Sequence, residues 1–159
     1  MLVDESVASE FLSVYKQLFW FLNASQEPEN IEQYVKLRPS IYQERDKQKF
    51  KDVVGSEFIT SLENAVFGKF VFLKKYQKGY VFHNIENEFY YQVYGLNSLI
   101  EDLVEEYSII ETAIIPFKNV LVCDGLIVEQ GMTLGKNMAR EIREGYWLAK
   151  RSGGLVVNV

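Results

Sequence analysis

The hydrophobic period of the chain changes at Gly68, and this change constrains the fold more than any other feature of the sequence. Before it, apolar residues recur every three or four positions, which is the spacing of one face of a helix. After it, from Lys69 to Gly95, aromatic and β-branched residues dominate and strong helix formers are few. We therefore expect a helical part at residues 1–67, ended by Gly68, and a mainly β part at residues 68–130.

The helical part divides at its polar and proline breaks. Residues 4–23 are predicted to form an amphipathic helix, and residues 29–37 a second one. Pro39 is expected to interrupt the second helix or to open the next segment, because proline lacks the N–H that a helix interior needs. The charged stretch 44–52 predicts an exposed helix or linker, and residues 56–67 predict the last helix of this part.

Six short segments of the second part have the composition of strands. They are residues 69–77, 80–84, 88–95, 111–115, 120–123 and 126–128. Turn signals at Lys78-Gly79 and at Pro116–Asn119 separate neighbouring strands, and a short helix is expected at residues 99–107. Asp124-Gly125 predicts a tight hairpin between the last two strands, because both residues tolerate positive φ. That turn is a sufficient structural reason for Asp124.

Together these elements predict a single α+β domain over residues 1–159. Its helices come first, an antiparallel β-meander of five to six strands follows, and a C-terminal helix at residues 133–150 packs on the sheet. A chain of 159 residues buries a core without disulfides or metals. No apolar run reaches the roughly 18 residues of a membrane helix. The start, MLVDESVASEFL, carries acids where a secretory signal needs bases, so a cytoplasmic protein is predicted.

The chain has one cysteine, Cys123, and one histidine, His83. These counts exclude an intrachain disulfide, a zinc site of four Cys and His ligands, and a metal site with two histidines. A catalytic Cys–His pair is not favoured, because Cys123 lies in an apolar strand, where cysteine usually acts as a small hydrophobe. A carboxylate-only Mg²⁺ site stays open, with Asp124 as its candidate. We predict no cofactor.

The acidic balance and the aromatic content favour contacts with other proteins. The net charge is −5, and 14% of the residues are aromatic. We predict a non-enzymatic protein-interaction domain with a protein partner, such as a regulator or inhibitor from a bacterial or mobile-element setting. The candidate contact residues are Trp20, Tyr90, Tyr91, Tyr94, Trp147, Glu101, Asp102, Glu105 and Glu106.

Two alternatives stay open. The first is a sheet that binds RNA or DNA, in which lysines contact phosphates and aromatic rings stack on bases. Its candidate residues are Lys69, Lys74, Lys75, Lys78, Tyr76 and Tyr80. The net charge and the absence of an RNA-recognition signature count against it. The second is an enzyme that uses carboxylates around Asp124, with or without Mg²⁺, and it requires the fold to bring a second acid there.

The segment PFKNVLVCDGLI, residues 116–127, resembles a pattern found in uncharacterised bacterial proteins. That pattern consists of proline-phenylalanine-lysine, a short apolar strand and aspartate-glycine-leucine, followed by a helix that bears tyrosine and alanine. Some members of the family carry a separate SEC-C zinc module, whose cysteines this chain lacks. The resemblance covers residues 111–150, and Cys123 stands where the family often has tyrosine. It implies a bacterial cytoplasmic origin and assigns no activity.

Overall fold

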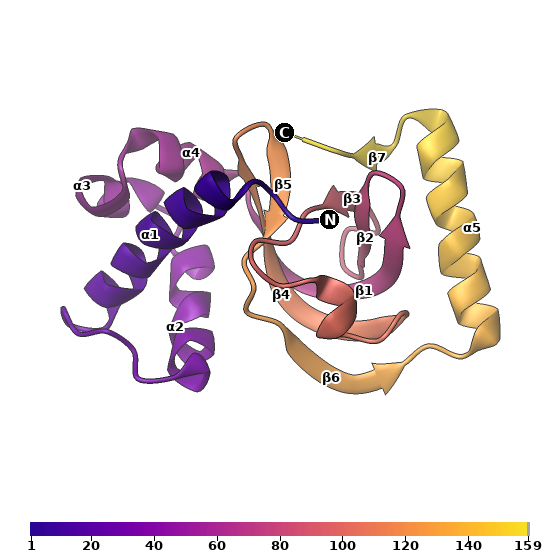
Figure 1. Cartoon of the computed structure of the whole chain (residues 1–159), viewed down its shortest axis with the longest axis horizontal. Coiled ribbons are helices and arrows are strands. Elements are labelled where there is room, and N and C mark those ends of the chain that lie inside the picture. The colour runs from indigo at the N-terminus through magenta and orange to yellow at the C-terminus, as the bar shows by residue number, and fades with distance from the viewer. Residues whose placement is uncertain (159) are drawn as a thin grey trace.

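The computed structural model describes residues 1–158, and Val159 lies outside the described residues. A strongly curled sheet forms its centre, with helices on two opposite sides (Figure 1). Four helices of the N-terminal part cover one side, and the C-terminal helix lies along the other (Figure 1). The predicted α+β class is thereby confirmed. No helix of the described part of the chain is long and apolar enough to cross a bilayer.

The elements of residues 1–158 follow one another in a simple order of helices, strands and a last helix. The helices are α1 (Glu5–Leu22), α2 (Ile31–Gln43), α3 (Lys51–Val54), α4 (Ser56–Glu63) and α5 (Lys136–Ser152), with 3-10 helices η1 (Lys47–Phe50) and η2 (Ile100–Asp102). The strands are β1 (Val66–Tyr76), β2 (Gly79–Asn84), β3 (Tyr90–Val93), β4 (Ser108–Phe117), β5 (Val120–Cys123), β6 (Val128–Thr133) and β7 (Leu155–Val156).

The sheet has seven strands, in the order β5-β4-β1-β2-β3-β7, with β6 also paired to β4. It differs from a simple meander because β4 returns to pair with β1. It also curls until its two ends meet, since Tyr94, just after β3, bridges to Val122 of β5. All named pairs are antiparallel except that of β3 with β7.

Three apolar clusters hold the layers together. Side chains alternate along β1, so Phe70 and Phe72 fill the interior of the curled sheet while Val71 and Leu73 face α5. The third cluster joins α1, α2 and α4 to the outer face of β4 and β5. Within it, the rings of Phe11 and Phe117 meet edge to face at 5.3 Å between centroids.

Two boundaries in the helical part differ from the prediction. α2 continues through Pro39 to Gln43, because the turn around the proline carries Arg38 and Ile41, both fully buried. Their packing outweighs the backbone hydrogen bond that proline removes. The last helix of this part ends at Glu63 and not at Gly68, since β1 already pairs with β4 from Val66 onward.

The predicted helix at residues 99–107 is also wrong in extent, because only η2 is helical there. Ile100 and Val104 both enter the interior of the curled sheet at its open end, while Leu103 between them is exposed. This burial fixes the segment as an irregular cap on the interior.

The predicted hairpin at Asp124-Gly125 does not form. β5 and β6 both pair with the same edge of β4, through Ile114 with Cys123 and Glu111 with Val128. The chain therefore keeps its direction, and residues 124–127 leave the ladder as a bulge. The other edge of β5 is occupied by the Tyr94 bridge, so no free edge remains for a returning strand.

Candidate functional site

A buried ion pair joins the helical layer to the bulge between β5 and β6. Arg38 of α2 places its Nη1 atom 3.2 and 3.3 Å from the two carboxylate oxygens of Asp124. Neither side chain has any solvent-exposed surface. The same Nη1 atom donates to the carbonyl of Leu126. Asp124 is therefore the counterion of a buried arginine, in addition to shaping the local backbone.

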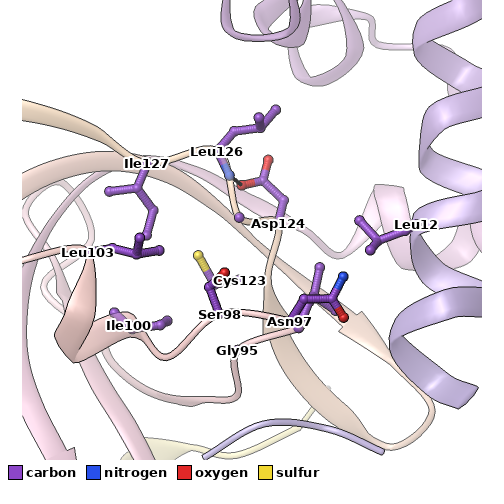
Figure 2. A pocket seen from close by; sticks show the side chains of 12 residues that line it. Leu12, Gly95, Asn97, Ser98, Ile100, Leu103, Cys123, Asp124, Leu126 and Ile127 are labelled. Carbon is purple, nitrogen blue, oxygen red and sulfur yellow. Dashed lines mark hydrogen bonds between the residues drawn. The ribbon is translucent and has the colours of Figure 1, made fainter. Parts of the chain in front are cut away.

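The carboxylate of Asp124 accepts three further hydrogen bonds. The Tyr15 hydroxyl of α1 donates to Oδ2 at 2.8 Å, and the Thr112 hydroxyl of β4 donates to Oδ1 at 3.1 Å. The backbone N–H of Leu126 donates to Oδ1 at 3.0 Å, which fixes the turn of the bulge (Figure 2). Four donors from separate segments thus satisfy a charge that would otherwise be costly to bury.

Neighbouring groups are held in their protonated forms. Burial, and then the charge of Asp124, raise the pKa values of Tyr15 and Tyr42 well above the ordinary value for tyrosine. Burial also raises the pKa of the Cys123 thiol to about 12. These groups therefore act near neutral pH as hydrogen-bond partners or apolar filling, and not as bases or nucleophiles.

Cys123 and His83 lie on opposite faces of the sheet. Cys123 belongs to the interior cluster, whereas His83 pairs with Val71 on the outer face and stacks on Tyr90 at 4.3 Å between ring centroids. Burial lowers the pKa of His83. The sheet separates the two side chains, so they do not form a catalytic pair.

One edge of the Arg38 guanidinium has no polar partner within residues 1–158. Its Nε and Nη2 atoms are buried without a hydrogen bond. The guanidinium carbon lies 4.9 Å from the centre of the Phe67 ring, so a cation–π contact stabilises this side. Asp124 and the Leu126 carbonyl are thus the polar partners that hold Arg38.

Three adjoining pockets surround the bulge, with volumes of about 210, 370 and 540 Å³. The smallest, drawn in Figure 2, lies between the bulge and the segment that contains η2. The pocket of about 370 Å³ lies against α1 and α2 and shares Leu12, Asp124 and Leu126 with the smallest pocket. The pocket of about 540 Å³ shares Leu103, Gly125 and Ile127 with it. We call the three together the bulge groove, because residues 124–127 run through it.

The bulge groove combines apolar walls with an acidic rim. Two of its apolar side chains are well exposed, Ile31 at 70% and Leu103 at 48%. The exposed acids that line it are Glu27, Glu29, Glu32 and Glu129, and the only basic residue in its lining is Lys16. Because Arg38 neutralises Asp124, the floor carries no net charge, while the rim, with four acids and one base, is negative.

The structure divides the predicted interaction residues into buried and exposed groups. Tyr90 and Tyr91 are 8% and 5% exposed and belong to core clusters, so they are not available to a partner. Tyr94 is half-buried where the sheet closes. Trp20 is 48% exposed and lies in a small pocket with Lys16 and Glu27, next to the bulge groove. Trp147 is exposed on α5, which lies on the opposite side of the sheet from α1 to α4.

The four predicted acids lie in the segment that forms one wall of the bulge groove. Glu101 already accepts a hydrogen bond from Tyr80 and pairs with Lys75 at 3.5 Å. Asp102, Glu105 and Glu106 are exposed on either side of Leu103. Leu103 lines the bulge groove, whereas none of the four acids is among its lining residues.

The predicted nucleic-acid residues do not form one surface. Tyr80 is fully buried inside the curled sheet, which corrects its assignment as a stacking residue. Lys75 is held by Glu101. Lys69 and Lys78 are exposed at opposite ends of the β1–β2 hairpin. Lys74 and Tyr76 stay together on the α5 side, with the Lys74 Nζ 5.2 Å from the centre of the Tyr76 ring.

The carboxylate pair that the enzyme alternative requires is not formed at Asp124. All hydrogen-bond and ion-pair partners of Asp124 are donors, and none is a second acid. Nowhere in residues 1–158 do three or more His, Cys, Asp or Glu side chains gather as a metal ion would require.

Arg38, Tyr15, Tyr42 and Thr112 were not identified from the sequence. One signal for Arg38 was present, because Tyr34, Arg38 and Ile41 fall at helical spacing and place a cation on an apolar face. The partnership with Asp124 depends on a separation of 86 residues and has no local signal.

No protein-family model, no curated protein and no solved structure matches this chain. The role of the site therefore rests on its own residues. The resemblance of residues 116–127 to bacterial proteins stays a prediction.

Proposed function

We propose that this chain is a protein-interaction domain whose bulge groove binds an apolar, basic-flanked segment of a partner protein. The observation that carries this proposal is the groove itself, in which exposed Ile31 and Leu103 face adjoining pockets ringed by acids. Proteins that act alone rarely expose a continuous apolar concavity of this kind, and such sites commonly accept partners.

The chemistry of the groove defines the segment that fits it. Apolar side chains fill the three pockets, and burial of each provides roughly 1.5–3 kcal/mol before the ordering of the segment is counted. Lysine or arginine residues on either side then meet Glu32 and Glu129 on the rim. Exposed charge pairs of this type add mainly association rate and selectivity. A segment with acidic flanks is repelled.

The buried cluster supports binding by positioning the floor of the groove. Arg38 and Thr112 hold Asp124 from two sides, and Asp124 in turn holds the N–H of Leu126. Leu126 and Ile127 therefore present their side chains from a fixed backbone. A preorganised floor lowers the ordering cost of binding.

The proposal can be tested by selecting binding peptides from a phage-displayed library of random 15-residue sequences. We expect enriched peptides to carry two or three apolar residues flanked by lysine or arginine. Titration of a selected peptide should give at least tenfold weaker binding to Leu103→Lys, which places a repelling charge in the groove.

Leu148→Lys provides the matched control. Leu148 is even more exposed than Leu103 but lies on α5, outside the groove, so peptide binding should change less than twofold. Peptides without a basic or apolar bias, or equal binding to both variants, would contradict the proposed site.

A further inference from the structure

α5 concentrates positive charge on one face of an otherwise acidic protein. The helix carries five bases and two acids, in a chain with net charge −5. At 100° per residue, its bases fall within an arc of about 100° around the helix axis, with Trp147 at the centre of that arc. The bases are Lys136, Arg140, Arg143, Lys150 and Arg151. We call these residues and Trp147 the α5 basic face.

This face is open to solvent. Ala139 and Tyr146 are the residues of α5 that are buried against the sheet. Every base of the face except half-buried Arg143 is exposed, and Trp147 is 40% exposed. Within residues 1–158, none of the five bases forms an ion pair. In Figure 1, α5 lies on the far side of the sheet from α1 to α4, with no element across its outer side.

Lys74 and Tyr76, near the end of the β1–β2 hairpin, extend the α5 basic face by one cation and one aromatic ring. The Tyr76 ring meets the Trp147 ring edge to face at 5.9 Å between centroids. The Nζ atoms of Lys74 and Lys150 lie 5.2 and 5.1 Å from the centres of Tyr76 and Trp147, respectively. The surface therefore alternates cations with aromatic rings across two elements.

Two features of this surface select among anionic partners. The bases run from Lys136 to Arg151, about 22 Å at 1.5 Å per residue, which suits an extended polyanion. The exposed apolar residues Met138, Trp147 and Leu148 point about 80° to 180° apart around the helix, so they do not form one apolar face of the kind that inserts into a lipid surface. The rings suit a ligand with flat faces of its own.

We infer that the α5 basic face binds single-stranded nucleic acid, with its bases on phosphates and Trp147 available for stacking. Single strands offer both unstacked bases and a flexible phosphate chain, which is the combination that aromatic and basic side chains recognise together. This activity uses a surface separate from the bulge groove and does not rest on the proposed peptide binding.

Fluorescence anisotropy with labelled 20-nucleotide oligo(dT) and oligo(U), between 50 and 200 mM NaCl, tests the inference. The test variant is Arg140→Gln/Arg143→Gln/Lys150→Gln. We expect at least tenfold weaker binding at 100 mM NaCl, and a salt slope reduced by about 2, since each single-strand phosphate contact contributes about 0.7. Trp147→Leu should weaken binding about fivefold or more at every salt concentration without changing the slope.

The matched control is Lys36→Gln/Arg45→Gln/Lys51→Gln, which removes the same charge from exposed positions in the helical layer. It should change affinity less than twofold, and Leu103→Lys should leave oligonucleotide binding intact. Circular dichroism confirms that each variant is folded. Absence of binding at 50 mM NaCl, equal loss in both triple variants, or binding only to phosphatidylserine vesicles would overturn the inference.

Discussion

Replacement of Asp124 with asparagine measures what the buried ion pair contributes to stability. Asparagine keeps the size of the side chain but removes its charge. Arg38 cannot lose its proton, so its guanidinium stays charged and fully buried, with the Leu126 carbonyl and the Phe67 ring as its remaining neighbours. Removal of one partner from a buried ion pair typically costs about 3–5 kcal/mol.

For a chain of this length, 1 kcal/mol changes the unfolding temperature by roughly 2–4 °C, so Asp124→Asn should lower it by roughly 6–20 °C. The free energy of unfolding is measured in urea, by tryptophan fluorescence and circular dichroism in parallel. Coincident transitions establish that the two-state treatment holds.

A double-mutant cycle separates the pair from its surroundings. Arg38→Met leaves Asp124 with its three other donors, and the variant that combines Arg38→Met with Asp124→Asn removes both charges. The combined loss should be smaller than the sum of the single losses by about 2 kcal/mol or more. The exposed pair of Lys49 and Glu44, 3.3 Å apart, is the control, and Lys49→Met should cost at most about 1 kcal/mol. Additive losses, or a cost for Asp124→Asn below that of Lys49→Met, would refute the reasoning.

Four further predictions test individual side chains, at α5 and around Asp124. Gly145→Ala should loosen the packing of α5, because the new Cβ meets the Tyr90 hydroxyl. This clash should outweigh the advantage of up to about 1 kcal/mol that alanine has over glycine in a helix. We expect faster amide exchange in α5, and the added substitution Tyr90→Phe should slow the exchange again. Cys123 in the native protein should react with a disulfide reagent at pH 8 at least about 100-fold more slowly than in urea, since its pKa is raised from 9.0 to about 12. For the same reason, the stability from the neutral thiol is intact below pH 9 and is lost as pH rises towards 12, which lowers the urea midpoint over that range. Thr112→Val removes a donor to Asp124 at nearly constant shape and should cost about 1.5–3 kcal/mol in urea unfolding, whereas exposed Thr133→Val should cost less than about 0.5 kcal/mol.

The elements whose signals are local were predictable from the sequence. The β1–β2 hairpin pairs Tyr76 with Gly79, next to the predicted Lys78-Gly79 turn, because turn chemistry and alternation act within a few residues. The first helix was expected at residues 4–23 and spans Glu5–Leu22. In both cases, burial and local propensity favour the same structure.

The bulge was not predictable, because the same dipeptide serves two structures. Asp124-Gly125 provides the positive φ that a hairpin needs, and Gly125 indeed has φ 83°. Whether the chain reverses depends on a free edge beside β5, and Tyr94 occupies that edge from 28 residues away. The other turn predicted in this region, at Pro116–Asn119, does form a hairpin, in which Lys118 and Asn119 have φ values of 50° and 68°.

Net charge alone is a poor guide to partners, because electrostatic attraction acts over a short range. At physiological salt the screening length is about 8 Å, so a ligand responds to the charges near its own site and not to the total. α5 carries five bases and two acids, whereas the rest of the chain carries 12 bases and 20 acids. Four exposed acids of the remaining chain line the bulge groove, and α5 with its basic face lies on the other side of the sheet (Figure 1). An overall charge of −5 is thus compatible with the two proposed surfaces, one for basic peptides and one for phosphates, which lie on opposite sides of the sheet.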